Sequence, residues 1–365
     1  MKILYVMFSF TTGGMEKLQV DTCNAMIKRN HEVSLCIINN LYSSEMLNKL
    51  DKKIDLIMLN RRPRVIDKIK AIKSILDIVN KKNIEVIHCN GINTPEMVLL
   101  SKIIKPNIKI YYTIHDSGQY KNLSFRQIIL RNIICKKLIA ISKCVEREMI
   151  QYGAHKSKVI KIYNGVDIEK YSKRSRNKKF DINNIKICNV ARIIPQKKGQ
   201  DLLIKAIEKL RIDFPNIKCY FLGEDLSDNQ NNINELKELV SKLKLENNII
   251  FLGNIEDITK VLSDMDIFVM PSRYEGFGLA LVEAMAMKLP CIASKLDGPY
   301  EIIGNEDRGL LFESGNYKEL YKKLYYMITN FEYFNNMTPM SLEYVLENFD
   351  LKKMIDNLEK VYEQR

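Results

Sequence analysis

The sequence lacks the cysteine and histidine patterns of disulfide-bonded and zinc-stabilised proteins. Its eight cysteines include no CxxC pair and no Cys/His cluster with zinc-ligand spacing, and its four histidines are scattered along the chain. Most of the cysteines lie in apolar runs, which is typical of buried thiols in a reducing cytosol. We therefore expect no structural metal.

Long apolar segments and a secretory leader are also absent. No segment approaches the roughly 18–20 apolar residues that cross a bilayer. The chain opens on a strand-like run, KILYVMFSF, without the basic start, apolar stretch and cleavage site of a signal peptide. With 46% hydrophobic and 28% charged residues it is not a disordered chain, and 365 residues suit two domains. The sequence predicts a folded cytoplasmic protein.

Acidic residues are scarce in the first half of the chain. Residues 1–165 hold 28 Lys/Arg against 13 Asp/Glu, a net charge of +15, whereas the remainder holds 29 against 31, a net charge of −2. This asymmetry indicates a polyanionic partner, either nucleic acid or an anionic membrane surface. No zinc finger, aromatic RNA-binding signature or recognition-helix motif supports nucleic acid.

Short β-rich apolar runs alternate with longer helical patterns, which is typical of parallel sheets with helices on both faces. A polar segment of poor periodicity, YSKRSRNKKFDINN (171–184), predicts a linker between domains at 1–170 and 185–349. We predict an α/β fold of two Rossmann-like, doubly wound parallel-sheet domains that face a central cleft, with ligands beyond the carboxyl ends of the strands. The predicted strands are Ile3–Phe10, Glu32–Ile38, Val86–Cys89, Lys109–Ile114, Lys137–Ile141, Val159–Ile162, Lys186–Val190, Lys218–Gly223, Ile249–Leu252, Ile267–Met270 and Pro290–Ala293.

The first strand–helix junction reads FSFTTGGMEKLQ. Gly13 and Gly14 would let the backbone approach an anion at the N-terminus of the following helix, and a flexible tight turn is an equally good interpretation. The spacing is not GxGxxG, so a dinucleotide-binding fingerprint is not supported.

A second junction, NVARIIPQKKGQ, carries several cations. Arg192 ends a strand, and Lys198 stands immediately before Gly199 and the next helix. Two cations in this position would neutralise a diphosphate without a metal, and a solvated basic loop is the alternative.

The segment RYEGFGLALVEAMAMKLPCIAS (273–294) contains two carboxylates around a glycine-rich turn. Glu275 lies in the loop and Glu283 on the following helix, while Gly276 and Gly278 bare the backbone for phosphate oxygens or sugar hydroxyls. Because a helix rises 1.5 Å per residue, the two carboxylates should lie apart along one wall. We expect each to accept hydrogen bonds from a vicinal diol rather than to share a proton.

Two further motifs have competing interpretations. SDMDIF contains Asp264 and Asp266 in a DxD, the metal-chelating signal of another class of sugar transferases. Asp266 leads into a buried strand, which favours an end-of-strand or helix-capping role. His115 ends the strand YYTIHD, and a lone histidine there favours a structural role.

Together the motifs resemble the retaining glycosyltransferases of family 4 (glycosyl transferases group 1), which have the GT-B fold. The resemblance runs in family order from about residue 1 to 315. Its motifs are GGME (13–16), Arg192 with Lys198-Gly199, and EGFGL (275–279) followed by Glu283, supported by AISKCV (140–145), YNGVD (163–167), FLGNI (251–255) and DMDIFVMPS (264–272).

The resemblance implies roles for individual residues. Arg192 and Lys198 would bind the donor diphosphate and stabilise the leaving nucleotide, Glu275 would hold hydroxyls of the donor sugar, and His115 would lie near that sugar. Further donor contacts are implied for Gly13, Gly14, Gly276, Phe277, Gly278 and Leu279, with Glu283 on the ribose and the backbone near Asn254 and Ile255 beside the base.

The family's front-face mechanism implies that the departing diphosphate takes the proton of the acceptor hydroxyl. No protein nucleophile, no cofactor and no metal ion would then be needed. The implied reaction moves a hexosyl or N-acetylhexosaminyl group from a nucleotide sugar, with UDP as the family-weighted base, to a saccharide or lipid-linked acceptor. A GT-B-like sugar-nucleotide epimerase and a non-catalytic scaffold subunit are the alternatives.

The family's final helix commonly returns to the first domain, and Leu351–Gln364 has the amphipathic pattern for it. The acceptor is expected in the N-terminal domain, where RRPRVIDKIKAIKSIL (61–76) and YKNLSFRQIILRNIICKK (120–137) mix cations with helically spaced apolar residues. Both suit ordinary packed helices. Cations such as Arg126 and Arg131 beside Phe125 and Ile129 also suit peripheral docking on the anionic inner face of the cell membrane.

Overall fold

A computed structural model describes residues 1–174 and 179–364, which divide into two compact units. The N-terminal unit holds Met1–Gly165 together with the residues from Leu351 onward, and the C-terminal unit holds Val166–Asp350. The division therefore lies before helix α8 (Ile168–Ser172) rather than at residue 170. Tyr171, placed in the predicted linker, is buried in that helix, and residues 175–178 of the linker lie outside the described residues.

The N-terminal unit is built on a parallel sheet of seven strands in the order β3-β2-β1-β4-β5-β6-β7. Five of its strands carry almost exclusively buried residues, as expected for strands covered on both faces. The strands are β1 (Lys2–Met7), β2 (Glu32–Asn39), β3 (Asp55–Arg61), β4 (Val86–Asn90), β5 (Lys109–Ile114), β6 (Lys137–Ala140) and β7 (Val159–Lys161).

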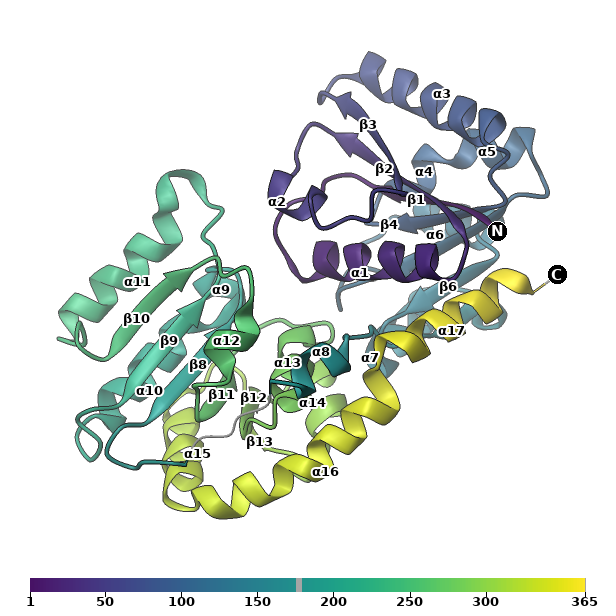
Figure 1. Cartoon of the computed structure of the whole chain (residues 1–365). Coiled ribbons are helices and arrows are strands. Elements are labelled where there is room, and N and C mark those ends of the chain that lie inside the picture. Colours follow the sequence, from purple (N-terminus) through teal and green to yellow (C-terminus); the bar gives the residue numbers. More distant parts are fainter. Residues whose placement is uncertain (175–178, 365) are drawn as a thin grey trace. The chain divides into compact units, whose positions relative to one another are not determined.

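Helices cover both faces of this sheet. Helices α1 (Gly14–Lys28) and α17 (Leu351–Glu363) pack together on one face, and α3 (Val65–Lys81) lies on the other (Figure 1). Right-handed crossovers place α4 (Thr94–Met97), α5 (Leu99–Ile104) and α6 (Phe125–Ile134) in the α3 layer, where α3 contacts α5 and α4 contacts α6. The remaining helices are α2 (Ser44–Leu47), α7 (Lys143–Gln151) and the 3₁₀ turn η1 (Lys156–Lys158).

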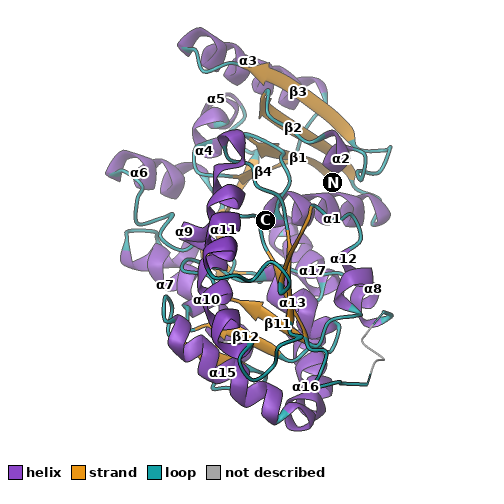
Figure 2. Cartoon of the chain, turned by 90° about the vertical axis from the view of Figure 1, so that its left-hand side faces the viewer, coloured by secondary structure: helices purple, strands orange, loops and turns teal. Residues whose placement is uncertain are grey.

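The C-terminal unit holds a parallel sheet of six strands in the order β10-β9-β8-β11-β12-β13. Figure 2 shows its strands in orange between purple helices. The strands are β8 (Lys186–Val190), β9 (Lys218–Leu222), β10 (Ile249–Gly253), β11 (Ile267–Met270), β12 (Cys291–Ser294) and β13 (Leu310–Phe312). Its helices after α8 are α9 (Pro195–Lys198), α10 (Gln200–Leu210), η2 (Asp228–Gln230), α11 (Asn231–Lys242), α12 (Ile258–Leu262), α13 (Leu279–Ala286), α14 (Asp297–Ile303), α15 (Tyr317–Thr329) and α16 (Phe331–Phe349).

Two doubly wound parallel-sheet units confirm the predicted fold class. Two strands were not predicted, and both carry weak signals. The edge strand β3 is only partly buried and contains Asn60 at a φ of 48°. Strand β13 has three residues, too few for a periodic pattern.

The last helix, α17, is fastened to the N-terminal unit by polar contacts as well as by its buried apolar face. Glu359 accepts from the His31 ring at 2.6 Å and also pairs with Arg29, while Tyr111 donates to the backbone of Val361 at 2.9 Å. The hydroxyl of Tyr362 lies against Nδ1 of His88 on β4. The chain's final helix thus completes the core of its first unit.

The prediction of buried thiols is confirmed for seven of the eight cysteines, and Cys144 is half-buried. Burial raises the pKa of Cys23 and of Cys36 to about 12, so these thiols stay protonated at neutral pH. Within the described residues, no helix is both long enough and apolar enough to cross a membrane.

Candidate functional site

The strand order of the C-terminal unit reverses between β8 and β11, which are hydrogen-bonded neighbours. In a doubly wound sheet this switch point opens a crevice beyond the carboxyl ends of the two strands, because the following connections leave in opposite directions. The loop after β8 carries Arg192 and Lys198, and the loop after β11 carries Glu275. The tertiary structure therefore brings together candidates that lie about 80 residues apart in sequence.

Lys198 and Glu275 form an ion pair across this crevice. The Nζ atom of Lys198 lies 2.8 Å from Oε2 of Glu275, and the side chains are only 17% and 15% exposed. The hydroxyl of Ser272, two residues after β11, donates to the same Glu275 oxygen at 3.3 Å. In this arrangement the carboxylate neutralises the lysine until an anionic ligand competes for it.

Arg192 precedes Lys198 in the loop after β8 and is exposed. Its guanidinium forms no ion pair with any residue in 1–174 or 179–364, while its carbonyl accepts a hydrogen bond of 2.9 Å from the buried amide of Gln200. The backbone is thus held while the cationic group stays available to a ligand. Lys197, the neighbouring alternative, instead uses its carbonyl to accept from the backbone of Arg273 at 2.8 Å.

Glycine is required at three positions around the crevice, by backbone conformation or by close packing. Gly199 has a φ of 68°, and a Cβ added there would lie 1.9 Å from the carbonyl oxygen of Pro271. Gly278, at a φ of 115°, precedes the first residue of α13, whose first turn has no side-chain cap. A Cβ on Gly298 of α14 would come within 2.8 Å of Gly276. Because the first turn of α13 has no side-chain cap, its backbone N–H groups are available to a ligand.

The other predicted donor contacts surround this turn. Leu279 begins α13, Phe277 is buried with its ring 5.2 Å from that of Phe349, and Glu283 lies buried on the same helix. Asn254 and Ile255 follow β10, which lies two strands from β8 in the sheet. All of these residues lie at the carboxyl edge of the C-terminal sheet or on the helix that leaves it.

An ion pair that was not predicted from the sequence connects the two sides of the crevice. Arg273 binds Asp201 of α10 through two hydrogen bonds of 2.7 and 2.8 Å and also donates to the carbonyl of Pro195 at 2.6 Å. Burial acts to raise the pKa of Asp201, but hydrogen bonds from Arg273 and its charge outweigh burial and lower this pKa. The pair joins the loop after β11 to the elements after β8, so it positions both halves of the site. The available sequence signal was an arginine two residues before Glu275.

Asp264 and Asp266 both bind Lys186 at the start of β8. Asp266 accepts from its backbone N–H at 2.8 Å, and Asp264 pairs with its ammonium group. This contact fits the end-of-strand role. No cluster of three or more metal-ligating side chains occurs among the described residues.

In the N-terminal unit, Gly13, Gly14 and His115 lie at the carboxyl edge of the seven-stranded sheet, after β1 and β5. Gly13 has a φ of 177°, extended backbone that any residue adopts, so only its lack of a side chain distinguishes it. The strand order reverses between β1 and β4 here. This edge therefore has its own switch point.

A buried chain of amides holds His115. Its Nε2 lies 2.8 Å from the side-chain oxygen of Asn90, whose amide nitrogen donates to Gln19 of α1 at 2.7 Å. In this network Nε2 carries the proton and Nδ1 is left as an acceptor. Burial lowers the pKa of His115 to about 4, so the ring is neutral at physiological pH. Asn90 and Gln19 were not among the predicted residues.

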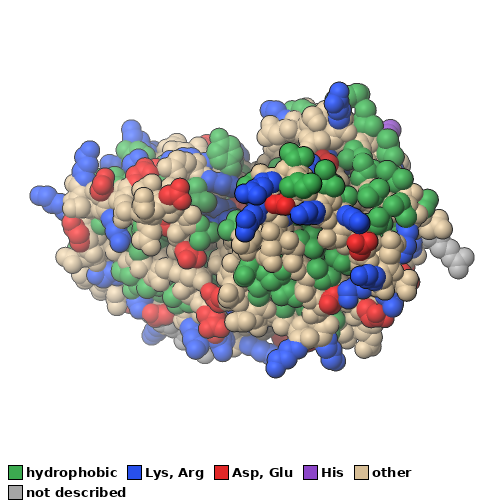
Figure 3. Space-filling model, turned by 90° about the horizontal axis from the view of Figure 1, so that it is seen from above, with side chains coloured by type: hydrophobic (Ala, Val, Ile, Leu, Met, Phe, Trp, Pro, Cys, Tyr) green, Lys and Arg blue, Asp and Glu red, His purple; other side chains and the backbone are tan. Residues whose placement is uncertain are grey.

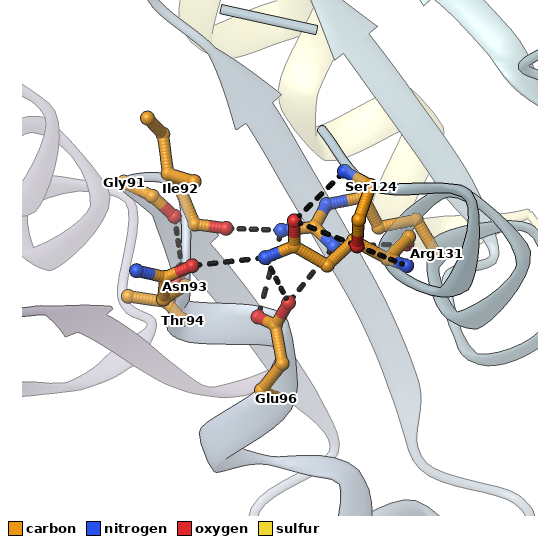
Figure 4. A network of polar contacts seen from close by, with 8 residues as sticks. Gly91, Ile92, Asn93, Thr94, Glu96, Ser124 and Arg131 are labelled. Carbon is orange, nitrogen blue, oxygen red and sulfur yellow. Dashed lines mark hydrogen bonds and ion pairs between the residues drawn. The ribbon is translucent and has the colours of Figure 1, made fainter. Parts of the chain in front are cut away.

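The basic helix α6 differs from expectation at Arg131. This side chain is fully buried, pairs with Glu96 at 3.0 Å and donates to the backbone of Ile92 (Figure 4). Its guanidinium carbon also lies 5.1 Å from the centroid of the Tyr112 ring. Its interpretation as a membrane-facing cation is therefore wrong. Arg126 is exposed, and a stripe of Phe125, Ile129 and Ile133 at helical spacing is exposed beside it.

Two family models match consecutive parts of the chain. Residues 12–170 match Glycosyltransferase Family 4, and residues 171–340 match Glycosyl transferases group 1. The UDP-Gal:alpha-D-GlcNAc-diphosphoundecaprenol alpha-1,3-galactosyltransferase of Escherichia coli is 22% identical, and the match covers 99% of this chain and 96% of that protein.

Solved structures share the complete fold. A glycosyltransferase from Rickettsia africae superposes with a TM-score of 0.86 at 24% identity, covering 99% of this chain and 97% of that one. HepE of Anabaena, solved with UDP and glucose, gives a TM-score of 0.85 at 21% identity over 100% of both chains. At these identities the likeness establishes the two-unit architecture.

Proposed function

Because this chain belongs to the family 4 glycosyltransferases, with the GT-B fold, we propose that it is a retaining hexosyl- or N-acetylhexosaminyltransferase that uses a UDP-sugar. Its product would contribute to a cell-surface polysaccharide, glycan or glycolipid. The observation that carries the proposal is the placement of Arg192 and the Lys198–Glu275 pair at the switch point of the C-terminal sheet. The UDP complex of the similar Anabaena protein supports the choice of base.

Each residue of the crevice then has a chemical task. The diphosphate would bind Arg192 and Lys198 and the free N–H groups at the start of α13, which leaves Glu275 to accept hydroxyls of the sugar. Glu283 would accept the ribose hydroxyls. The two cations stabilise the charge that develops on the leaving diphosphate, so the proposal includes no metal ion and no other cofactor.

In the proposed reaction the bond between the sugar C1 and the diphosphate oxygen breaks while the acceptor oxygen bonds to C1 on the same face. The acceptor proton passes to the departing diphosphate, so UDP and a glycoside with retained configuration are the products. Gly13, Gly14 and the neutral His115 would serve the reacting sugar from the N-terminal unit. No separate protein base is required.

A screen of nucleotide sugars tests this proposal. Purified protein should bind UDP-sugars in calorimetry and release UDP when an acceptor is added, with turnover unchanged by EDTA and α-linked products from α-linked donors. Lys198→Ala should lower kcat/KM by about 100-fold, because one charged contact to the leaving group is lost. Absence of binding and of UDP release across the panel would contradict the proposal.

We further propose that the acceptor is lipid-linked and that the N-terminal unit docks peripherally on the anionic inner face of the cell membrane. Exposed apolar side chains on α6 and α3 stand among cations, namely Phe125, Ile129, Ile133, Val65, Ile66 and Ile69 with Arg62, Arg64, Lys68 and Arg126. Lys and Arg side chains also lie among hydrophobic ones on the surface seen in Figure 3. Apolar insertion combined with positive charge suits an anionic bilayer. The diphospholipid named for the similar E. coli enzyme supports this acceptor class.

Vesicle sedimentation tests the docking. Phe125→Ser with Ile133→Ser, or Arg126→Glu alone, should weaken binding to vesicles containing phosphatidylglycerol but not alter the fold. Phe125 and Ile133 are 76% and 70% exposed, and Ile212 of the C-terminal unit, at 79%, offers the matched control Ile212→Ser. Equal binding of the wild type to neutral and anionic vesicles would refute membrane docking through this surface. A loss of binding in Ile212→Ser as large as that in Phe125→Ser with Ile133→Ser would refute it too.

A further inference from the structure

A cationic pocket lies in the N-terminal unit where β3 ends and α3 begins. It has a volume of about 260 Å³ and is lined by residues from both elements. Arg61, Arg62, Arg64 and Lys70 supply four positive charges against one carboxylate, that of Asp67. Pockets that enclose drug-sized ligands measure about 300–1,000 Å³, so this one suits a charged headgroup rather than a whole ligand.

The cations of this pocket are not neutralised by the protein. Across the two described ranges, 1–174 and 179–364, none of the four side chains is in an ion pair. Arg61 donates from Nη1 to Asn39 at 2.9 Å, yet its Nε is buried and has no hydrogen-bond partner in the described part of the chain. A buried donor without an acceptor is unfavourable, and an anion would supply the missing acceptor.

The backbone is shaped to place these groups. Between Ile37 and Asn39 the pairing register of β2 with β3 shifts, because β3 advances from Met58 to Arg61 over the same interval. This extra residue forms a bulge with Asn60 in the left-handed region, and a bulge re-aims the side chain that follows it. The 17-residue helix α3 then starts with no side-chain cap on its first turn. Its free N–H groups add to the positive potential.

The surroundings of the pocket indicate what carries the anion. Val65, Ile66 and Ile69 are strongly exposed on α3 beside the pocket. The pocket also lies on the carboxyl edge of the sheet, as does the Gly13-Gly14 turn after β1. The two strand spacings between β3 and β1 amount to about 10 Å.

We infer that this pocket binds the phosphate or diphosphate group of the acceptor, with the acceptor's apolar chain against the exposed side chains of α3. This inference rests on the proposed function for the identity of the acceptor, but the anion site itself does not. It is separate from the donor diphosphate site, which uses Arg192 and Lys198 of the C-terminal unit.

Binding of inorganic pyrophosphate tests the anion site without turnover. The measurement uses calorimetry in a Lys198→Ala background, in which the other candidate diphosphate site is weakened. Arg62→Gln with Arg64→Gln should lower the affinity at least tenfold. Lys52→Gln with Lys53→Gln removes the same charge at the opposite end of β3 and should change it less than twofold. Equal affinities for the two double variants would overturn the site.

Turnover then distinguishes the source of the phosphate. With Lys198 intact, Arg62→Gln with Arg64→Gln should raise KM for a diphospholipid-linked acceptor in detergent at least tenfold, while KM for the donor and for a phosphate-free alkyl glycoside changes less than twofold. Equal increases for both acceptors would overturn the inference. The inference would also be overturned if this double variant lost binding to phosphatidylglycerol vesicles but kept its KM for the diphospholipid-linked acceptor. The phosphate bound in the pocket would then be that of a membrane lipid.

The two proposals can fail separately. If the wild-type protein transfers no sugar but pyrophosphate binding depends on Arg62 and Arg64, the proposed function fails and the anion pocket stands. If the wild-type protein transfers sugar, but Arg62→Gln with Arg64→Gln changes neither the affinity for pyrophosphate nor the KM for the acceptor, the pocket fails and the proposed function stands.

Discussion

Arg273 and Asp201 form a two-point ion pair, with hydrogen bonds of 2.7 and 2.8 Å, that joins the loop after β11 to the first turn of α10. Neither residue carries a proposed contact with the donor. Their importance lies in the two segments they connect. The loop after β11 contains Glu275, and α10 begins two residues after Lys198.

We predict that Asp201→Asn destabilises the C-terminal unit by about 1–3 kcal/mol, because Arg273 would keep its partly buried charge without a full counter-charge. Displacement of the Glu275 loop should lower kcat/KM by about 10- to 100-fold. Urea unfolding and steady-state kinetics check both effects. Lys205→Ala removes only the exposed partner of Asp201 at 3.5 Å and should cost less than about 0.5 kcal/mol. Equal effects of the two variants would contradict the positioning role.

The Lys198–Glu275 pair predicts an asymmetric result for the two glutamates of the crevice. Glu275→Ala frees Lys198 for the diphosphate, so affinity for UDP alone should stay the same or rise, whereas turnover of the UDP-sugar should fall by about 100-fold. Glu283→Ala should weaken UDP and the UDP-sugar alike, by about tenfold. Calorimetry with both ligands measures this difference. Parallel losses for UDP and the UDP-sugar in Glu275→Ala would rule out the division of roles.

Asn90 is predicted to act as a positioning residue for His115. Asn90→Ala leaves the His115 Nε2–H and the Gln19 amide oxygen without their partners, at about 1–3 kcal/mol for each unsatisfied group. We expect Asn90→Ala to lower kcat about tenfold and to leave the affinity for UDP unchanged. Asn90→Asp keeps an acceptor for His115, so it should recover part of the lost kcat. The control Asn93→Ala breaks only an exposed contact with Gln127. Equal kcat values for the alanine variants would disprove the role.

The buried His88 predicts loss of stability in acid. Burial, together with a smaller contribution from the nearby His115, lowers the pKa of His88 to about 3, whereas the unfolded chain has a value near 6.5. Between these values the unfolded state binds the extra proton, so stability is fully present above about pH 6.5 and declines as pH falls toward 3. The loss from this residue between pH 7 and 4.5 is about 2–3 kcal/mol.

Hydrogen exchange of β4 at the two pH values, in the wild type and in His88→Gln, measures this contribution. Glutamine does not titrate, so the variant should lose about 2 kcal/mol less than the wild type on acidification. Its stability at pH 7 will be lower, since His88 contacts both Tyr362 and Thr113, and only the difference in pH dependence is diagnostic. An unchanged pH dependence would exclude His88 as the titrating group.

Helix α6 illustrates why charge alone does not reveal exposure. Arg126 and Arg131 both flank apolar residues in the sequence, yet one is exposed and the other is fully buried. The burial of Arg131 depends on Glu96 and Tyr112, which come from different elements. Ser124 and Gln127, by contrast, form a capping box that starts α6, a signal that is local and therefore readable from sequence.

By itself the sequence determined the two parallel α/β units and the loops that carry Arg192, Lys198 and Glu275, because strand periodicity and glycine turns are local properties of the chain. The tertiary structure alone decided the contacts between distant segments. Asp201 reaches Arg273, Asn90 reaches His115, and a bulge at Asn60 gathers the cations of β3 and α3. Each depends on strand order and side-chain burial, which long-range packing sets and no short segment encodes.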